Sequence, residues 1–220
     1  GDSVTGFVAD LTQTQVDDFI VQPRQPHPTK SESEAMPIVH TLLGMATTRI
    51  VYDLDRFRRT RKANPNDSVK WEPPFAATIA RETHVSDLGQ NQKSKLQISF
   101  SYSDGFGREI QKKIQAEPGP IIEGGPIVNP RWVGSGWTIF NNKGKPVRQY
   151  EPFFSATHGF EFGVQVGVSP VLFYDPAERV IATLHPNHTY EKVVFDPWQQ
   201  TSYDVNDTSA PRNQPGNQQT

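Results

Sequence analysis

One phrase recurs along the chain and constrains its fold more than any other feature. An aromatic residue is followed by Asp or Asn, then by a short turn, then by a basic residue that opens the next apolar stretch. The clearest copies run from Tyr174 to Arg179 and from Phe140 to Lys145. Asp and Asn side chains accept hydrogen bonds from backbone N–H groups and so stabilise tight turns. Each copy therefore predicts a β-hairpin, which must pair with its neighbours because one hairpin cannot bury its own apolar face.

A longer copy runs from Tyr102 to Arg108, and two weaker copies begin at Tyr52 and Phe195. In each copy we expect the ring to be buried, the acid or amide to bind the turn, and the basic side chain to cover the ring. Gly144 is expected to adopt a positive φ, because such a turn closes with a left-handed residue. The role predicted for these positions is structural. They are Tyr52, Asp53, Tyr102, Asp104, Gly105, Gly107, Arg108, Phe140, Asn141, Gly144, Tyr174, Asp175, Arg179, Phe195 and Asp196.

The spacing of apolar residues from Thr48 onward has a period of two. In Leu96–Tyr102, four apolar or aromatic residues alternate with three polar ones, the pattern of a half-buried strand. Short apolar stretches separated by turn signals then follow. They are Glu109–Gln115, Trp137–Phe140, Val147–Tyr150, Val171–Tyr174, Val180–Leu184 and Tyr190–Phe195. Residues 48–204 are therefore predicted to form an antiparallel β region.

The two ends of the chain differ from this region. Residues 1–47 form an acidic segment in which Val16, Phe19 and Ile20 have helical spacing, and Pro37–Ala46 predicts a short helix. Between them, Gln22–Glu34 holds three prolines and a charged run, which predicts a loop. Residues 205–220 are rich in Asn, Gln and Pro and are expected to form a disordered tail.

Composition excludes several classes of site. The chain has no cysteine, which excludes disulfides, Cys-type zinc sites and thiol catalysis. Its formal net charge is −2, so the charge as a whole does not attract nucleic acid or an anionic membrane. No apolar stretch approaches the 18 residues that a membrane-spanning helix needs, so we expect no direct membrane insertion.

The histidines and carboxylates offer little chemistry. His185 and His188 form the closest histidine pair, but they flank a predicted turn, so we interpret them as exposed turn residues with no metal. His158 lies in a Phe-rich stretch and is interpreted as a hydrogen-bonded packing residue. A glycosidase needs two carboxylates that face each other, which sequence does not reveal. The four acids considered for that role are Glu151, Glu161, Asp175 and Glu191.

Two clusters have competing interpretations. Five cations lie between Arg56 and Lys62 with one aromatic residue, Phe57. Nucleic-acid binding favours more interleaved aromatics, so a solvated loop is the preferred interpretation. The cluster Phe153, Phe154, Phe160 and Phe162 fits core packing of a sheet better than a sugar-binding platform.

The repeated phrase resembles the YD, or Rhs, repeat, whose template is Tyr-Asp-x-x-Gly-Arg, a strand, Pro-Asp-Gly-Thr and another strand. Tyr174–Phe195 is similar to one full unit but has Glu178 and His188 where the template has Gly. Longer blocks resemble the B component of bacterial insecticidal Tc toxin complexes. These blocks are Ala46–Phe57, Phe100–Pro120, Trp132–Ser155 and Gly167–Gln200.

The resemblance implies a fold and a role. That B component is far longer than this chain, so the resemblance implies a piece of its Rhs-repeat part: a mainly β, antiparallel sheet of hairpin repeats within a curved shell, with a short helix near the N-terminus. In this family B and C form a hollow cocoon around the toxic region of C, and a pore-forming A component receives it.

The role implied is thus a secreted, non-catalytic structural segment without cofactor. Its partners would be the C component, as shell partner and payload, and the A component through other parts of the B chain. Two alternatives stay open, namely a carbohydrate- or protein-binding β module and a glycosidase-type enzyme.

Overall fold

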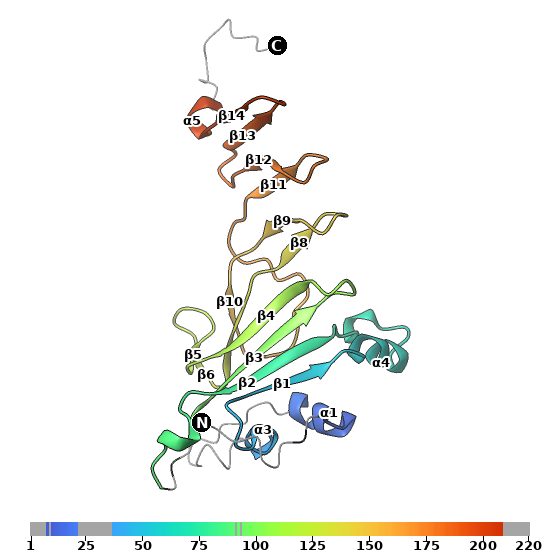
Figure 1. The fold of residues 1–220 in the computed structure, drawn as a ribbon, viewed down its shortest axis with the longest axis vertical. Helices are drawn as coiled ribbons and strands as arrows, with labels where there is room; N and C mark the ends of the chain where they lie inside the picture. Colours follow the sequence, from blue (N-terminus) through green and yellow to red (C-terminus); the bar gives the residue numbers. More distant parts are fainter. Residues whose placement is uncertain (1–7, 9, 22–36, 91, 93, 209–220) are drawn as a thin grey trace, which may run out of the picture. The chain divides into compact units, whose positions relative to one another are not determined.

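The computed structural model describes residues 8, 10–21, 37–90, 92 and 94–208 (Figure 1). The chain divides into two compact units: unit 1 contains residues 1–135 and 152–163, and unit 2 contains residues 136–151 and 164–220. The boundaries expected at residues 47 and 204 both fall inside a unit. The first does so because the N-terminal helices share their hydrophobic core with the sheet of unit 1.

Unit 1 is built on a six-stranded antiparallel sheet in the order β1-β2-β3-β4-β7-β10 (Figure 1). The strands are β1 (Thr48–Asp53), β2 (Phe75–Arg81), β3 (Leu96–Ser103), β4 (Glu109–Ala116), β7 (Arg131–Gly134) and β10 (Phe153–Ser155). A two-stranded ribbon of β5 (Gly119–Pro120) and β6 (Ile127–Val128) connects β4 to β7. The helices are α1 (Gln13–Val21), α3 (Pro37–Leu43), α4 (Arg56–Ala63) and the 3-10 turns η1 (Ser68–Lys70) and η2 (Val85–Asp87).

The core of unit 1 lies between α1, α3 and one face of the sheet. Alternation places every second residue of β3 on this face, as the sequence of Leu96–Tyr102 predicts. Phe100 is at the centre: its ring contacts those of Phe19 from α1, Phe75 from β2 and Trp132 from β7. The two helices thus fold onto the sheet because their apolar faces complete this aromatic cluster.

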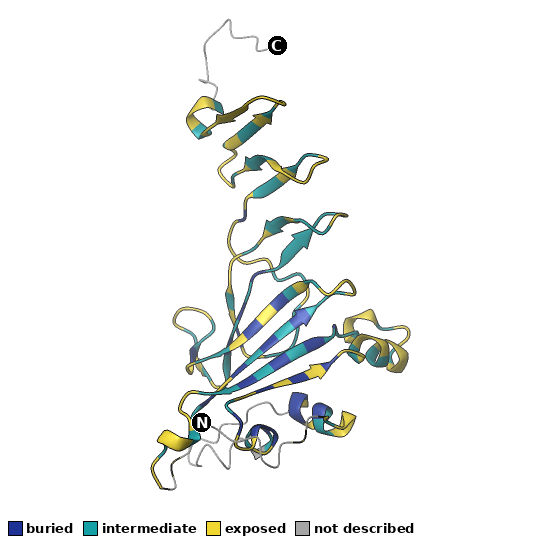
Figure 2. Cartoon of the chain, in the orientation of Figure 1, coloured by how far each residue is buried: buried dark blue, intermediate teal, exposed yellow. Residues whose placement is uncertain are grey.

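Unit 2 consists of hairpins in series. β8 (Thr138–Phe140) pairs with β9 (Pro146–Gln149), and a four-stranded antiparallel sheet follows in sequence order. Its strands are β11 (Val171–Tyr174), β12 (Val180–Leu184), β13 (Tyr190–Phe195) and β14 (Gln200–Tyr203), followed by the one-turn helix α5 (Val205–Thr208). Among the described residues of unit 2, no hydrophobic side chain is buried (Figure 2). The described part of this unit therefore has no buried hydrophobic core of its own.

The structure confirms most elements predicted from sequence. All seven predicted strands occur within one or two residues of their expected bounds, and the helices predicted around Phe19 and at Pro37 are present.

The loop predicted for Arg56–Lys62 is wrong: this segment is helix α4, whose inner face is bound by ion pairs to neighbouring segments. The expected tail begins with α5, while residues 209–220 and the loop at 22–34 lie outside the described residues. No helix in the described part is long and apolar enough to cross a membrane.

Candidate functional site

Four hairpin turns share one backbone geometry. In each, the first residue donates its N–H to the carbonyl of the fifth, at 2.8–2.9 Å, and the fourth donates to the carbonyl of the first, at 3.0–3.1 Å. The fourth residue has a positive φ, between 66° and 80°. This is the three-residue hairpin loop closed by a left-handed residue. The turns are Asp104–Arg108, Asn141–Lys145, Asp175–Arg179 and His185–Thr189.

Asp175 shows how the first residue stabilises such a turn. Its Oδ1 accepts the N–H of Arg179 at 2.9 Å, and its Oδ2 accepts Arg179 Nε at 2.7 Å. These hydrogen bonds, the backbone one above all, lower the pKa of Asp175. Asp104 is bound in the same way by Arg108: burial works to raise its pKa, but the bonds from Arg108 and Phe106 together lower it.

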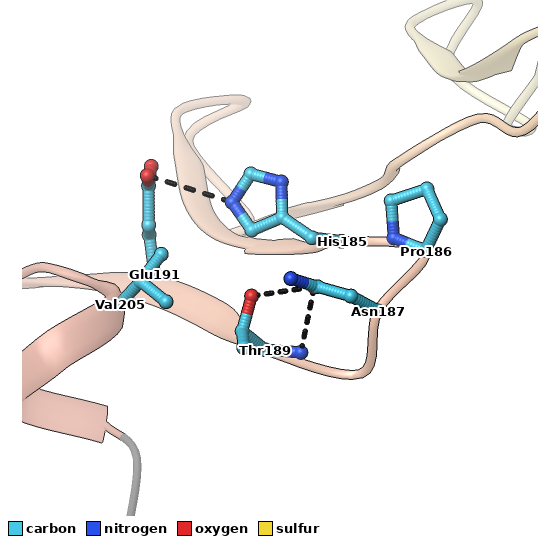
Figure 3. A pocket seen from close by; sticks show the side chains of 6 residues that line it. All are labelled: His185, Pro186, Asn187, Thr189, Glu191 and Val205. Carbon is cyan, nitrogen blue, oxygen red and sulfur yellow. Dashed lines mark hydrogen bonds and ion pairs between the residues drawn. The ribbon is translucent and has the colours of Figure 1, made fainter.

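The turn at His185 departs from this pattern, because its first side chain does not bind the turn. Asn187 Oδ1 accepts the N–H of Thr189 instead, at 3.2 Å. The imidazole of His185 is thereby free to face Glu191, with Nε2 3.5 Å from Oε1, in a shallow pocket of about 390 Å³ (Figure 3). His188 is exposed. The described residues contain no group of three metal-ligating side chains.

Turn residues also join neighbouring hairpins of unit 2. Lys143 Nζ donates to the carbonyl of Pro176 at 2.9 Å, and Lys145 forms an ion pair with Glu178 at 2.9 Å. Tyr174 donates its hydroxyl to the carbonyl of Pro146 at 2.7 Å. These contacts hold the β8–β9 hairpin beside β11, so the repeat phrase supplies bonds between hairpins as well as within them.

The rings assigned to the repeat are less buried than expected. Tyr102 is buried, but Phe140, Tyr174 and Phe195 are only half-buried. Arg179 lies over the ring of Phe195, with its guanidinium carbon 4.0 Å from the centroid. The prediction placed the basic residue over the ring of its own copy, whereas Arg179 covers the ring of the next copy of the phrase.

The copy at Tyr52 is not a hairpin, which corrects the sequence interpretation. Tyr52 is 56% exposed and Asp53 is buried, the reverse of the expected arrangement. Asp53 binds Arg56 at 3.4 Å and Arg59 at 2.5 Å, because the chain enters helix α4 here. The copy at Phe195 does make a turn, but a tighter one, in which Asp196 accepts the N–H groups of Trp198 and Gln199 at 2.8 and 2.9 Å. Gly105 occupies the second position of its turn without a positive φ.

We expect Gly144→Val to lower the free energy of unfolding by about 2 kcal/mol, because a β-branched residue is strongly disfavoured at positive φ. The structure confirms the predicted conformation, with φ 80° at Gly144. Lys143→Val, one residue earlier in the same turn, is the matched control and should cost less. Urea denaturation of both variants makes the comparison; an equal cost would contradict the turn geometry.

Glu178 and His188 both adopt φ 66°, at the two positions where the repeat template has Gly. We expect His188→Gly to stabilise the protein by about 0.5–1 kcal/mol, because glycine removes the strain of the left-handed conformation. Glu178→Gly removes the same strain but also the ion pair with Lys145, so its gain should be smaller. Thermal unfolding measures both; destabilisation by His188→Gly would show that its side chain has a stabilising contact.

Strand β4 carries polar side chains into the core, which sequence analysis did not predict. Gln111 and Lys113 are fully buried. The Gln111 amide binds the backbone of Glu161 twice, donating to its carbonyl at 3.0 Å and accepting its N–H at 2.9 Å. Lys113 forms an ion pair with the Glu161 carboxylate and donates to the carbonyl of Thr157 at 3.3 Å. These groups fix the 157–161 segment over the sheet.

His158, in this segment, is a packing residue, as predicted. Its ring lies 4.9 Å from that of Phe100 and 5.6 Å from that of Trp132, centroid to centroid. Burial lowers the pKa of His158 to about 4, so the imidazole is neutral at physiological pH. Phe160 packs against the core, whereas Phe162 and Phe154 are exposed. The predicted core role therefore applies to only part of the phenylalanine cluster.

Among the described residues, no contact joins any two of the four carboxylates considered for glycosidase chemistry. Glu161 pairs with Lys113, Asp175 with Arg179 and Glu191 with His185. The fourth, Glu151, donates its backbone N–H to the carbonyl of Val166 and is exposed. Three of the four acids thus have a basic side chain as their partner.

Of the known proteins compared with this chain, only solved structures match it. No protein-family model matches the chain, and no curated protein does. The crystal structure of TcdB2–TccC3 matches with 22% identity and a TM-score of 0.58, over 77% of this chain and 8% of that chain. A TcdB2–TccC3–TEV crystal structure matches with 18% identity and a TM-score of 0.60, over 94% and 11%. The Photorhabdus luminescens Tc holotoxin pore matches with 20% identity and a TM-score of 0.54, over 91% and 10%.

The chain has the fold of these Tc toxin structures. This confirms, at the level of the fold, the resemblance drawn from the hairpin phrases and the longer sequence blocks. It also confirms the mainly antiparallel β class with a helix near the N-terminus. The chain spans 8–11% of the length of the Tc toxin chains that it matches, so it corresponds to one segment of their fold.

Proposed function

We propose that this chain is a non-catalytic wall segment of a toxin-encapsulating β-sheet cocoon, secreted as part of the B component of an insecticidal Tc complex. The observation that carries the proposal is the construction of unit 2, where hairpins follow one another and no described hydrophobic side chain is buried. An independent enzyme domain of this length builds one central core. A repeat array is instead stabilised by contacts between neighbouring repeats, which here are the hairpins.

The exposed apolar residues of unit 2 support the same conclusion. Phe173 on β11 is 47% exposed, and Val194 on β13 is exposed as well. Strand β14 is the last strand of its sheet, so one of its edges has no partner among the described residues. Such edges and faces favour pairing with further strands, as in a wall that continues on either side of this segment.

The candidate chemistry is consistent with a role without catalysis. Hydrogen bonds that Arg179 donates stabilise the ionised form of Asp175 and lower its pKa, the opposite of what a general acid needs. Glu161 forms an ion pair with the buried ammonium of Lys113. Both carboxylates therefore have structural partners that explain their positions.

The proposed partners follow from the structures with the same fold. These are named as complexes of TcdB2 with TccC3 and as a Tc holotoxin pore. By analogy, this segment would enclose the payload of a C component. Contact with the A component would be made by other parts of the B chain, with no nucleic acid bound and no direct insertion into a membrane.

Protease protection of the payload tests the proposal. A B-type polypeptide containing this segment is co-expressed with a C component, and digestion of the toxic region is followed over time. Deleting residues 164–208 should expose the payload, whereas deleting residues 209–220 should leave it protected. Electron microscopy of the deletion variant checks that the rest of the shell assembles. Equal protection in both deletions would contradict a wall function.

Two further assays address the alternatives. A glycan array that shows specific binding, lost when Trp198 or Phe173 is replaced by Ala, would favour a carbohydrate-binding module. Hydrolysis of chromogenic glycosides that is lost in Glu191→Gln would favour an enzyme. The proposed wall function predicts neither result.

A further inference from the structure

Helix α4 has two faces with different surroundings. Its inner face forms ion pairs: Arg56 binds Asp53 at 3.4 Å and also Glu72, while Arg59 binds Asp53 at 2.5 Å and Asp17 of α1 at 3.3 Å. These ion pairs anchor the helix to the end of β1 and to α1. The outer face is therefore held in a defined orientation, and the wall function proposed above does not use it.

Trp71 packs against two side chains of the outer face of α4, Arg61 and Phe57. Its ring lies 5.2 Å from the guanidinium carbon of Arg61 and meets the ring of Phe57 edge-on, at 6.0 Å and 83°. The indole N–H donates to the carbonyl of Asn64 at 2.8 Å, which fixes the ring orientation. We call this group of Phe57, Arg61, Lys62 and Trp71 the α4 platform. Rigid aromatic and arginine side chains of this kind dominate binding energy at protein interfaces.

The α4 platform carries positive charge that no carboxylate of the described residues neutralises. Of the neighbouring cations, Arg58 pairs with Asp55 at 2.8 Å and Lys70 with Asp67 at 2.9 Å. In the described residues, neither Arg61 nor Lys62 has a carboxylate partner. The charge excess is local, because the whole chain has a formal net charge of −2.

Apolar side chains accompany these cations. Phe57 is exposed, and Val69, two residues before Trp71, is 92% exposed. Two exposed apolar side chains therefore lie in the same segments as two cations without a carboxylate partner among the described residues. The complement of these side chains is a segment that presents both carboxylates and an apolar side chain.

We propose that the α4 platform binds an acidic polypeptide segment of a partner protein, with carboxylates at Arg61 and Lys62 and an apolar side chain against Phe57. The inner face of the same helix provides a precedent, since Arg59 already donates a hydrogen bond to an acidic side chain, Asp17 of helix α1. Nucleic acid fits less well, because its binding energy comes mainly from contacts between many Lys or Arg side chains and phosphates, and the platform has one Arg and one Lys. An anionic membrane requires clusters of about four to eight cations, whereas the platform offers two, Arg61 and Lys62, that have no carboxylate partner in the part of the chain that the structure describes.

Fluorescence anisotropy tests this proposal directly. The probe is a fluorescein-labelled octapeptide with four Glu and two Leu residues, titrated with the protein at low salt and again at high salt. We expect saturable binding that weakens with salt. The double variant Arg61→Glu/Lys62→Glu should weaken binding by about tenfold or more, because it converts two attractions into repulsions.

Matched controls separate this surface from general charge effects. Lys112→Glu/Lys192→Glu makes the same change of charge at an exposed position of β4 and a half-buried position of β13, and should alter the dissociation constant by less than about twofold. Arg61→Gln/Lys62→Gln repeats the test with neutral residues, and circular dichroism checks that each variant is folded. Trp71→Ala should also weaken binding by removing the ring that orients Arg61.

Three results would overturn the proposal. The first is equal binding of the peptide by the wild type and both α4 variants. The second is no saturable binding at low salt. The third is binding of an oligothymidylate but not of the acidic peptide, which would assign the platform to nucleic acid.

Discussion

Phe100→Ala is expected to lower the free energy of unfolding by about 3–5 kcal/mol, as for other buried large aromatics. The side chain is fully buried at the centre of unit 1. Its removal leaves a cavity between the sheet and the helices and abolishes several ring contacts, each worth about 0.5–1.5 kcal/mol beyond burial. Those contacts, at centroid distances of 4.9–6.0 Å, are with Phe19, Phe75, Tyr102, Trp132 and His158.

The same substitution in unit 2 provides a matched control. Phe173 on β11 is half exposed, so Phe173→Ala should cost less than about 1 kcal/mol. Urea denaturation followed by circular dichroism and by tryptophan fluorescence measures both variants. Equal costs would show that unit 2 buries its rings in solution, against the open arrangement described above.

The second large effect is expected at the buried ion pair. Glu161→Gln leaves the ammonium of Lys113 in the core without a counter-charge, which should cost about 3–5 kcal/mol. Lys113→Met should cost less, because it leaves behind a carboxylate that is 33% exposed and can be solvated. The double variant Lys113→Met/Glu161→Gln should lie close to the wild type, since an apolar replacement of both charges is often neutral.

The pH dependence gives an independent test of the same pair. Burial lowers the pKa of Lys113 below 10.5, although Glu161 opposes this shift. Between the lowered pKa and 10.5 the unfolded chain binds more protons than the folded one, so this group makes stability rise with pH. Glu161→Gln removes the opposing charge, lowers the pKa of Lys113 in the folded state further, and should make stability rise more strongly with pH. A stability profile of Glu161→Gln that is flat as the pH approaches 10.5 would contradict the burial of Lys113.

The hairpins could be predicted from sequence because the information for each is local. In the turn Asn141–Lys145, all the bonds that define the turn join residues at most four positions apart. The positive φ of Gly144 follows from that local pattern. The extent of Leu96–Tyr102 followed from alternation alone, because this strand has a buried side and a more exposed side.

Helix α4 could not be predicted in the same way. Arg56–Lys62 has almost no apolar residue, so hydrophobic periodicity gives no helical signal. What stabilises it instead is charge on one face: Arg56 and Arg59 reach Asp53, and Arg59 also reaches Asp17, which lies 42 positions away in sequence. Such partners are invisible until the chain is folded.

The burial of Gln111 and Lys113 on β4 could likewise not be predicted from the sequence. Lys113 is buried and Ile114 is exposed, the reverse of what hydrophobicity favours. The sequence alone determined where the hairpins turn and which residues close them, because those bonds form within a few residues of one another. Only the tertiary structure decided which polar groups enter the core. Burial of Lys113 depends on the 157–161 segment, which returns 44–48 positions later to supply a carbonyl and a carboxylate that no neighbour in the strand provides.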